Sequence, residues 1–228
     1  MSYILASGCS FTNKNWRSYK HPELELWTKW PELIGAEKNI ETINLGKNGA
    51  SNRLILKNAS AQIYIRKPKI VLILLTDMSR FSVYGAWNMV FKGYAPQKNV
   101  YDTHLRTMFG EFVFEQSSIK DVITEQFIDI LNFVNMCKTK KIKVLIGQNH
   151  IGPFNLIDWK KGEAINEFIN NPLFKEMESN KEHFIGWPWL PELGGYQLSS
   201  AEHEISAGDH HPTEEGQKFI ANHFLRYL

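Results

Sequence analysis

Short, largely apolar runs recur along the chain and predict buried β-strands. The runs cover residues 3–6, 41–45, 70–75 and 143–147. The runs at 70–75 and 143–147 lack an alternation of apolar and polar residues, which is typical of strands covered by helices on both faces. A parallel sheet buried between helices is therefore expected.

Between these runs, apolar residues recur at intervals of three and four, the spacing of amphipathic helices. The pattern predicts helices that start near residue 30 and cover 52–66, 119–141 and 213–228. Pro31 suits a first helical turn, where its missing N–H costs little. The alternation of strands and helices predicts an α/β fold with right-handed crossovers.

Composition excludes several classes of protein. A length of 228 residues indicates one domain, and a net charge of +2 gives no electrostatic reason to expect a nucleic-acid or membrane-surface partner. No apolar run approaches the roughly 20 residues that a membrane-spanning helix needs. The first residues lack the features of a secretion signal, so a cytoplasmic protein is expected. Cys9 and Cys137 make no disulfide framework and are expected to stay reduced.

One segment departs from the alternating pattern. About forty residues, at about 79–118, separate the predicted strand at 70–75 from the next predicted helix, and a connection this long is typical of a lid or binding loop. The segment is rich in Phe, Tyr and Trp, which make up 13% of the chain. It either packs its own aromatic rings as a subdomain or contacts substrate, and the two roles are compatible. The prediction is one domain, 1–228, with an aromatic-rich insertion.

Candidate chemistry gathers in the loops that follow the predicted strands, the edge where open parallel sheets bind ligands. These loops contain Ser10 after the first strand, Gly49 and Asn52 after the second, Thr76, Asp77 and Arg80 after the third, and Asn149 after the fourth. Asp209 and His211 stand just before the last predicted helix. A serine hydroxyl becomes a good nucleophile when an imidazole removes its proton and a carboxylate orients that imidazole. Ser10, His211 and Asp209 are therefore candidates for these three roles.

Three short blocks resemble those of the SGNH or GDSL-type hydrolases. Residues 7–12 read Ser-Gly-Cys-Ser-Phe-Thr and resemble the first block, with Cys9 where the commonest version has Asp. Residues 44–52 are similar to the second block, and residues 209–212, followed by Gly216, are similar to the last. The first and second blocks and the Trp-Pro-Glu-Leu stretch near residue 30 look most like SGNH-like proteins encoded by bacteriophages, whose place of action would be the host cytoplasm or the virion.

The resemblance implies a three-layer α/β/α sandwich, flavodoxin-like, with a five-stranded parallel sheet, and it implies hydrolysis of carboxylic esters. Ser10 would be the nucleophile, His211 the general base and then acid, and Asp209 the group that orients it. The backbone N–H groups of Ser10 and Gly49 would bind the oxyanion. No metal or organic cofactor is expected. The acidic neighbour Asp209 is expected to raise the pKa of His211 above about 6.5.

The third block departs from the family pattern. It usually carries an Asn as a further oxyanion donor, and residues 73–80 contain none. Thr76, Ser79 and Arg80 are candidate substitutes. Because losing one such donor typically costs about 10² to 10³ in rate, two functions stay open. One is a serine esterase or acetylesterase; the other is a binding or structural protein that kept the fold with weak or no activity.

Five residues are candidates for substrate contacts, and each has a structural alternative. Asn52 either contacts substrate or caps the following helix. Asn149 either contacts substrate or satisfies loop backbone, and Arg80 either contacts substrate or serves the oxyanion. Trp187 and Trp189 either pack against the core or form a platform for a sugar face. The substrate class predicted is a small-molecule or carbohydrate ester.

Two alternatives concern the catalytic groups themselves. Cys9 at a helix start would have a lowered pKa and could replace Ser10 as the nucleophile. A metal site could instead use the imidazole and carboxylate groups near the C-terminus, namely His203, Asp209, His210 and His211. The motif match favours Ser10 and His211.

Overall fold

The computed structural model describes residues 2–76, 80–83, 87–90, 119–149, 161–190, 193–195, 198 and 201–228. Most of the predicted insertion at 79–118 lies outside the described residues. The elements in chain order are β1 (Tyr3–Gly8), α1 (Trp30–Lys38), β2 (Glu41–Asn44), α2 (Asn52–Ile65), β3 (Ile70–Leu75), β4 (Arg80–Val83), β5 (Trp87–Val90), α4 (Ile119–Thr139), β6 (Lys143–Gln148), α5 (Lys161–Asn170), α6 (Phe174–Glu178), β7 (Glu204–Ser206), β8 (Asp209–Pro212) and α7 (Glu214–Leu225), with short 3₁₀ turns at Lys181–His183 and Ala201–His203.

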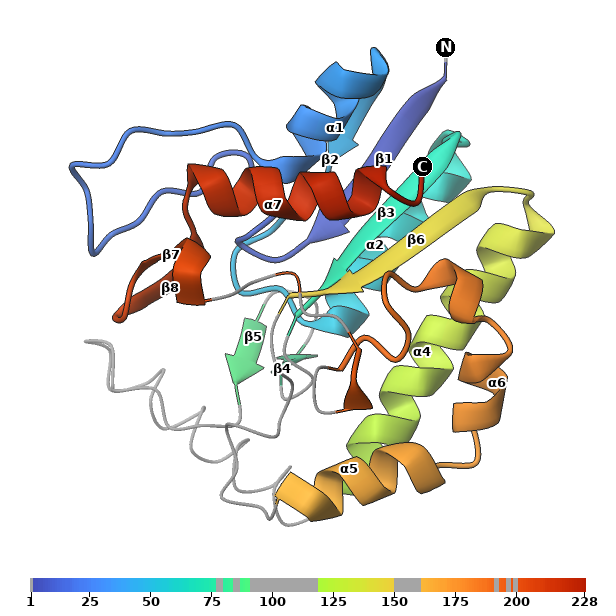
Figure 1. Cartoon of the computed structure of the whole chain (residues 1–228). Helices are drawn as coiled ribbons and strands as arrows, with labels where there is room; N and C mark the ends of the chain where they lie inside the picture. Colours follow the sequence, from blue (N-terminus) through green and yellow to red (C-terminus); the bar gives the residue numbers. More distant parts are fainter. Residues whose placement is uncertain are drawn as a thin grey trace.

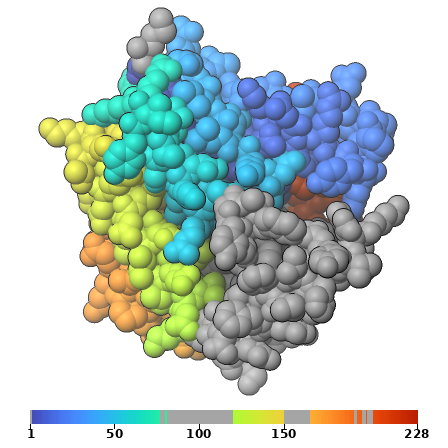
Figure 2. Space-filling view, turned by 180° about the vertical axis from the view of Figure 1, so that it is seen from behind, coloured from blue at the N-terminus to red at the C-terminus, as the bar shows by residue number. Residues whose placement is uncertain are grey.

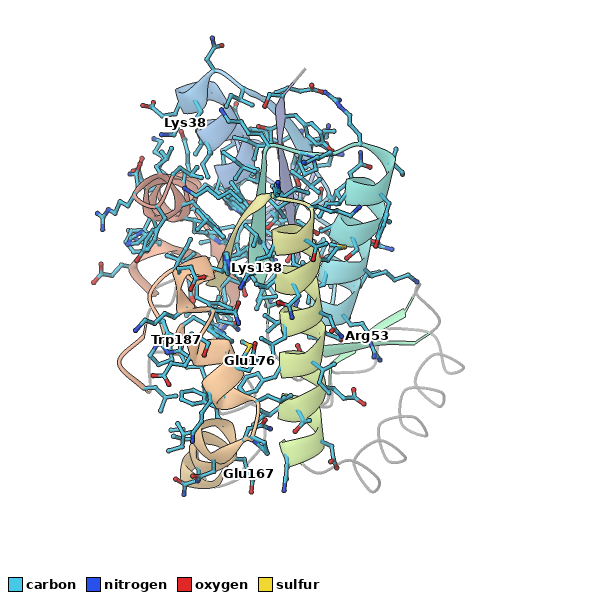
Figure 3. The ribbon with its side chains drawn as sticks, turned by 90° about the vertical axis from the view of Figure 1, so that its right-hand side faces the viewer. Lys38, Arg53, Lys138, Glu167, Glu176 and Trp187 are labelled. Carbon is cyan, nitrogen blue, oxygen red and sulfur yellow. The ribbon has the colours of Figure 1, made fainter. Side chains whose placement is uncertain are left out.

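A parallel sheet with the strand order β2-β1-β3-β6 forms the centre of the fold (Figure 1). Every residue of β1 and β3 is buried, as expected for strands between two helical layers. Helices α1 and α7 cover one face (Figure 1), and α2 and α4 cover the other, which Figure 2 shows from behind. The ion pair between Arg53 and Asp129, 3.3 Å, joins α2 to α4 (Figure 3). The predicted α/β/α sandwich is confirmed.

The sheet has four strands in the described residues, whereas five were expected. At the free edge of β6 a single parallel bridge joins Ile146 to Phe184, and the Ile185 N–H donates to the Ile146 carbonyl over 2.9 Å. The extended segment stops there because Gly186 turns the backbone to a φ of 69° and Pro188 has no N–H to continue a ladder. The expected fifth strand is thus reduced to one bridge.

Local sequence signals account for the helix ends. The Ser51 hydroxyl accepts a hydrogen bond from the Leu54 N–H and caps α2. The Thr213 hydroxyl caps α7 in the same way, and two glutamates in the first turn of α7 suit its dipole. Pro31 stands in the first turn of α1, as predicted, and that helix ends at Asn39 in the left-handed conformation.

A strap and a hairpin cross the carboxyl edge of the sheet. The strap is residues 12–29, which form neither helix nor strand. It runs past the antiparallel hairpin β7–β8, which leads into α7. His21 Nε2 lies 2.9 Å from Ser206 Oγ, and the Lys20 ammonium donates to the Gly208 carbonyl. These contacts tie the two segments together where the loops after β1 and β2 emerge. Among the helices described, none is long and apolar enough to cross a membrane.

Candidate active site

Three side chains from opposite ends of the chain form a continuous hydrogen-bonded series. Ser10 Oγ lies 2.8 Å from His211 Nε2, and His211 Nδ1 lies 2.6 Å from Asp209 Oδ1. A carboxylate only accepts hydrogen bonds, so Nδ1 carries the proton and Nε2 is left to accept from the serine hydroxyl. Ser10 and Asp209 are each 7% exposed, and the His211 side chain is 24% exposed. This is the arrangement in which an imidazole activates a serine.

Strand geometry explains why the side chains of Asp209 and His211 lie together and that of His210 lies apart from them. Side chains two residues apart in a strand point to the same face, and the residue between them points to the other. Asp209 and His211 share the inner face of β8, while His210 is exposed and pairs with Glu204 over 2.7 Å. Within the described ranges, no three His, Cys, Asp or Glu side chains gather as potential metal ligands.

The loop after β1 places Ser10 at the carboxyl edge of the sheet. A tight turn follows the strand, in which the Thr12 and Asn13 N–H groups both donate to the Cys9 carbonyl. Gly8 permits the turn, because a Cβ there would lie 2.0 Å from the Thr12 hydroxyl oxygen. Cys9 is fully buried and its Sγ accepts from the Asn149 amide, so Ser10 is the residue that meets the imidazole.

Ser18, a residue of the strap, completes the environment of Asp209. Its hydroxyl donates to Asp209 Oδ2, the oxygen that His211 does not use, and it accepts from the N–H groups of Lys20 and His21. Burial raises the pKa of Asp209, but the hydrogen bonds from Ser18 and His211 outweigh it and hold that pKa below its usual value. Asp209 is therefore ionised at neutral pH.

The imidazole of His211 lies among aromatic rings. Trp16 stacks on it with ring centroids 3.8 Å apart and 19° between the planes, and Phe11 is tilted against it at 5.2 Å. Burial lowers the pKa of His211, and the hydrogen bond to Asp209 opposes this only in part. The expected upward shift was wrong, because the desolvation of the ring outweighs the carboxylate.

Two backbone N–H groups in the loops after β1 and β2 lack an acceptor within the described residues. Neither Ser10 nor Gly49 donates its N–H to an acceptor among the described residues. The Gly49 loop is tied to the end of β1 by the Lys47 N–H on the Gly8 carbonyl, 3.0 Å, and by the 2.8 Å bond from Asn13 to Asn48. Gly49 has a φ of 66°, which explains the glycine at this position.

The third-block candidate Thr76 is held in place by two amide side chains. Its N–H donates to Asn52 Oδ1 over 2.8 Å, and its carbonyl accepts from Asn52 Nδ2 and Gln148 Nε2 over 3.1 and 3.0 Å. Thr76 is fully buried, and its hydroxyl oxygen has no hydrogen-bond partner among the described residues. The fully buried Asn52 amide thus holds the backbone at the end of β3, and a contact between Asn52 and substrate stays a prediction.

The other predicted substrate contacts take different positions. Asn149 is fully buried, and its side-chain amide donates to Cys9 Sγ in the loop after β1. Trp189 is fully buried and stacks on Phe184, 4.6 Å between centroids, and half-buried Trp187 packs on Phe174 at the start of α6 (Figure 3). Trp189 lies in the core and Trp187 packs against it, while a platform for a sugar face stays a prediction.

Arg80, the first residue of β4, is the predicted contact whose charge influences His211. Its Nε and Nη1 atoms are buried and have no hydrogen-bond partner among the described residues. Its positive charge opposes protonation of His211 and so lowers the pKa of that imidazole. Ser79 lies outside the described residues.

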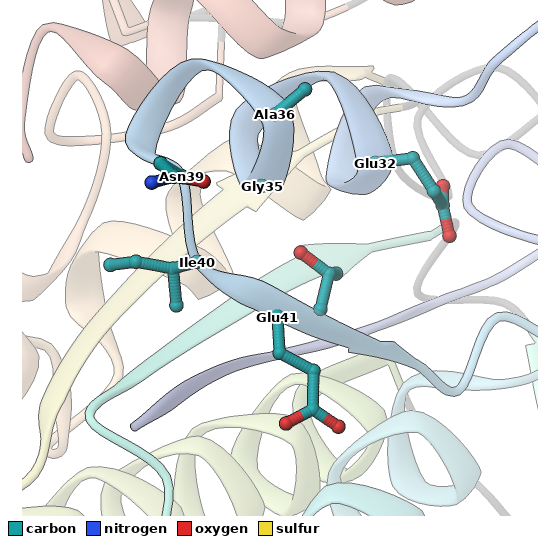
Figure 4. Close-up of a pocket in the computed structure, with 7 residues that line it drawn as sticks. Glu32, Gly35, Ala36, Asn39, Ile40 and Glu41 are labelled. Atoms are coloured by element: carbon teal, nitrogen blue, oxygen red, sulfur yellow. The ribbon is translucent and has the colours of Figure 1, made fainter. Parts of the chain in front are cut away.

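A hollow at the other end of the sheet is separate from the triad. It lies between α1 and the start of β2 (Figure 4) and is lined by Glu32, Gly35, Ala36, Asn39, Ile40, Glu41 and Thr42. In a parallel sheet, the amino end of β2 lies at the edge opposite to the one where Ser10 emerges. Glu32 also hydrogen-bonds the Asn44 amide over 2.9 Å.

Sequence reasoning missed the strap residues Ser18 and Trp16. Both are buried, at 6% and 3% exposure, and both contact the triad. They stand in a stretch without helical or strand periodicity, so no pattern marked them as internal.

Several solved structures share this fold with the chain along its whole length. A catalytic mutant of the acetylxylan esterase Axe2 from Geobacillus stearothermophilus has a TM-score of 0.54 at 16% identity, covering 99% of this chain and 93% of that one. The structure of TesA has a TM-score of 0.54 at 12% identity, covering 100% and 98%. The psychrotrophic esterase EstA from Pseudoalteromonas sp. has a TM-score of 0.52 at 14% identity, covering 100% and 96%. No protein-family model and no curated protein matches the sequence.

Proposed function

We propose that the protein is a serine ester hydrolase that acts through an acyl-enzyme on Ser10. The observation that carries the proposal is the series Ser10, His211, Asp209, with contacts of 2.8 and 2.6 Å between groups 201 and two residues apart in the sequence. Hydrogen bonds of this length from a nucleophile to a base, and from that base to an orienting group, are what nucleophilic catalysis requires.

The reaction follows from the donors and acceptors present. Ser10 Oγ attacks the acyl carbon and gives its proton to His211 Nε2, while Asp209 stabilises the imidazolium. The bond to the leaving alcohol then breaks, and the alcohol oxygen takes that proton. Water attacks the acyl group on Ser10, His211 accepts a proton from the water, and this proton returns to the serine as the acid departs.

The N–H groups of Ser10 and Gly49 are the proposed oxyanion donors, and the Thr76 hydroxyl is the proposed third. Support comes from the absence of competing acceptors for these three groups within the described residues. Donors already in place stabilise the negative charge of the tetrahedral intermediate without reorganisation. The proposed substrates are small acyl esters such as acetyl esters, including those of carbohydrates.

Turnover of 4-nitrophenyl acetate tests the proposal, with EDTA present to exclude metal-dependent hydrolysis. Wild type should give a burst of 4-nitrophenol as Ser10 is acylated, and Ser10→Ala should give neither burst nor steady turnover. Cys9→Ala is the matched control and should keep the burst. Hydrolysis that survives in Ser10→Ala would refute the proposal. A folded wild type without any hydrolysis would favour the alternative, a binding or structural protein without the usual third-block Asn.

A kinship with bacteriophage proteins and a cytoplasmic location stay predictions of the sequence.

A further inference from the structure

A buried lysine lies beside the proposed active site without taking part in the reaction described above. Lys29 is 1% exposed, and its Nζ lies 4.6 Å from the ring centroid of Trp27 and 5.6 Å from that of Trp16. Ring faces attract a cation, which accounts for an ammonium held in this position. Burial lowers the pKa of Lys29 to about 8, so the amine is mainly charged at neutral pH and below.

Trp16 connects this cation to the catalytic base. The same indole ring that faces the ammonium at 5.6 Å stacks on the His211 imidazole at 3.8 Å. Because both distances are measured from the Trp16 ring, Lys29 Nζ and the His211 ring centroid lie at most about 9.4 Å apart. The space between them contains buried ring atoms rather than solvent, so the interaction escapes most salt screening.

We propose that Lys29 is a positioning residue that acts across Trp16: its fixed charge disfavours the imidazolium form of His211 and keeps the base free to activate Ser10 at mildly acidic pH. The inference rests on the proposed function, because it concerns the same base. It assigns a role to a strap residue that makes no direct contact with the reacting atoms.

The other groups around His211 define the balance in which Lys29 takes part. Asp209 on β8 favours the imidazolium, and Arg80 on β4 disfavours it, as Lys29 does. The groups of the β1 loop and the strap that touch the ring are uncharged, namely Ser10, Phe11 and Trp16. Two cations thus oppose one carboxylate at the imidazole, and Lys29 is the one that is almost fully buried. Lys29 itself faces Glu32, which favours its charged form, and Arg17, which disfavours it.

Lys29→Met tests the proposal because it removes the charge and keeps an unbranched side chain. At about 9 Å and an effective dielectric constant of about 20, removing the charge should raise the pKa of His211 by roughly one unit. The acid limb of the pH–rate profile should move up by the same amount, so the rate well below this limb should fall up to about tenfold. The rate on the alkaline plateau should not fall. Lys29→Arg should restore the wild-type limb, and Lys14→Met, an exposed cation of the same strap, should leave it unchanged.

A merely structural role gives a different result, since a displaced Trp16 or His211 lowers the rate equally at every pH. That outcome, or an unchanged limb in folded Lys29→Met, would overturn the proposal. NMR titration of the His211 ring in wild type and Lys29→Met measures the same shift without turnover, so it separates failure of this inference from failure of the esterase proposal. If the neutral variants do not fold, NMR of labelled lysine in wild type decides: an amine that titrates at its ordinary value of about 10.4 is solvated and refutes the proposal.

Discussion

Ser18→Ala removes the hydrogen bond that Asp209 receives from the strap. In the folded protein the Ser18 hydroxyl donates to Asp209 Oδ2, and both residues are less than a tenth exposed. A hydrogen bond to a charged group contributes ~1.5–3 kcal/mol, and its loss here leaves a carboxylate oxygen buried without that donor. For a chain of this length ~2 kcal/mol corresponds to a fall in Tm of about 4–8 °C.

The pH dependence of this loss has a definite sign. The pKa of Asp209 is lowered in the folded protein, so its ionised form adds stability above the unfolded pKa of about 3.9, and this contribution disappears as the pH falls through the folded pKa. Ser18→Ala removes part of the cause of that lowering. The stability difference between wild type and Ser18→Ala should therefore be largest near neutral pH and shrink below about pH 4.

Thermal unfolding followed by circular dichroism between about pH 3 and 7 measures both effects, as linkage requires. Ser60→Ala is the matched control, because the Ser60 hydroxyl donates to the Leu56 carbonyl of its own helix over 2.8 Å and has no ionised partner among the described residues. That variant should stay within about 0.5 kcal/mol of wild type at each pH. An unchanged Tm in Ser18→Ala, or a loss of equal size at pH 3 and pH 7, would show that the strap does not stabilise the Asp209 carboxylate.

Two further substitutions probe the site. Asp209→Asn should lower kcat by about 10³ to 10⁴, because an amide donating to Nδ1 favours the imidazole tautomer that cannot accept from Ser10. Steady-state assays with 4-nitrophenyl acetate measure this loss. A loss below tenfold would contradict the role of Asp209. Asn52→Ala removes both hydrogen bonds to the Thr76 backbone and should destabilise the protein by about 2–4 kcal/mol while lowering kcat. Urea unfolding measures that destabilisation against Asn166→Ala, an exposed position on α5, and equal stability of the two variants would count against the Asn52 contacts.

The parts of the protein that follow from local pattern were predictable. The apolar runs predicted the four strands, because strands buried between two layers of helices need apolar side chains on both faces. The capping residues and the proline predicted where the helices begin. The meeting of Ser10, Asp209 and His211 was predictable because the three residues stand in blocks that resemble those of a known family and suit a nucleophile, a carboxylate and a base. The five-stranded sheet was wrong, since the edge beyond β6 depends on how Gly186 redirects a short segment.

Features that depend on tertiary contacts could not be predicted from the sequence. Ser18, Trp16 and Lys29 are internal only because their strap lies against the β7–β8 hairpin, nearly the whole chain away. Asn52 lies at the carboxyl edge of the sheet, but the backbone of Thr76, just after β3, occupies its side-chain amide. The direction of the His211 pKa depends on burial of its ring, which no neighbouring residue in the sequence reveals.

The separation of Ser10 from His211 by 201 residues also has a consequence for biosynthesis. The serine leaves the ribosome 201 residues ahead of the imidazole that contacts it. Helix α7 follows the β7–β8 hairpin and docks through the Gln217 side chain, which accepts from the Trp30 N–H and donates to the Phe11 carbonyl. Because domains generally fold as units during synthesis, the nascent chain should carry an inert hydroxyl until the β7–β8 hairpin and α7 have docked.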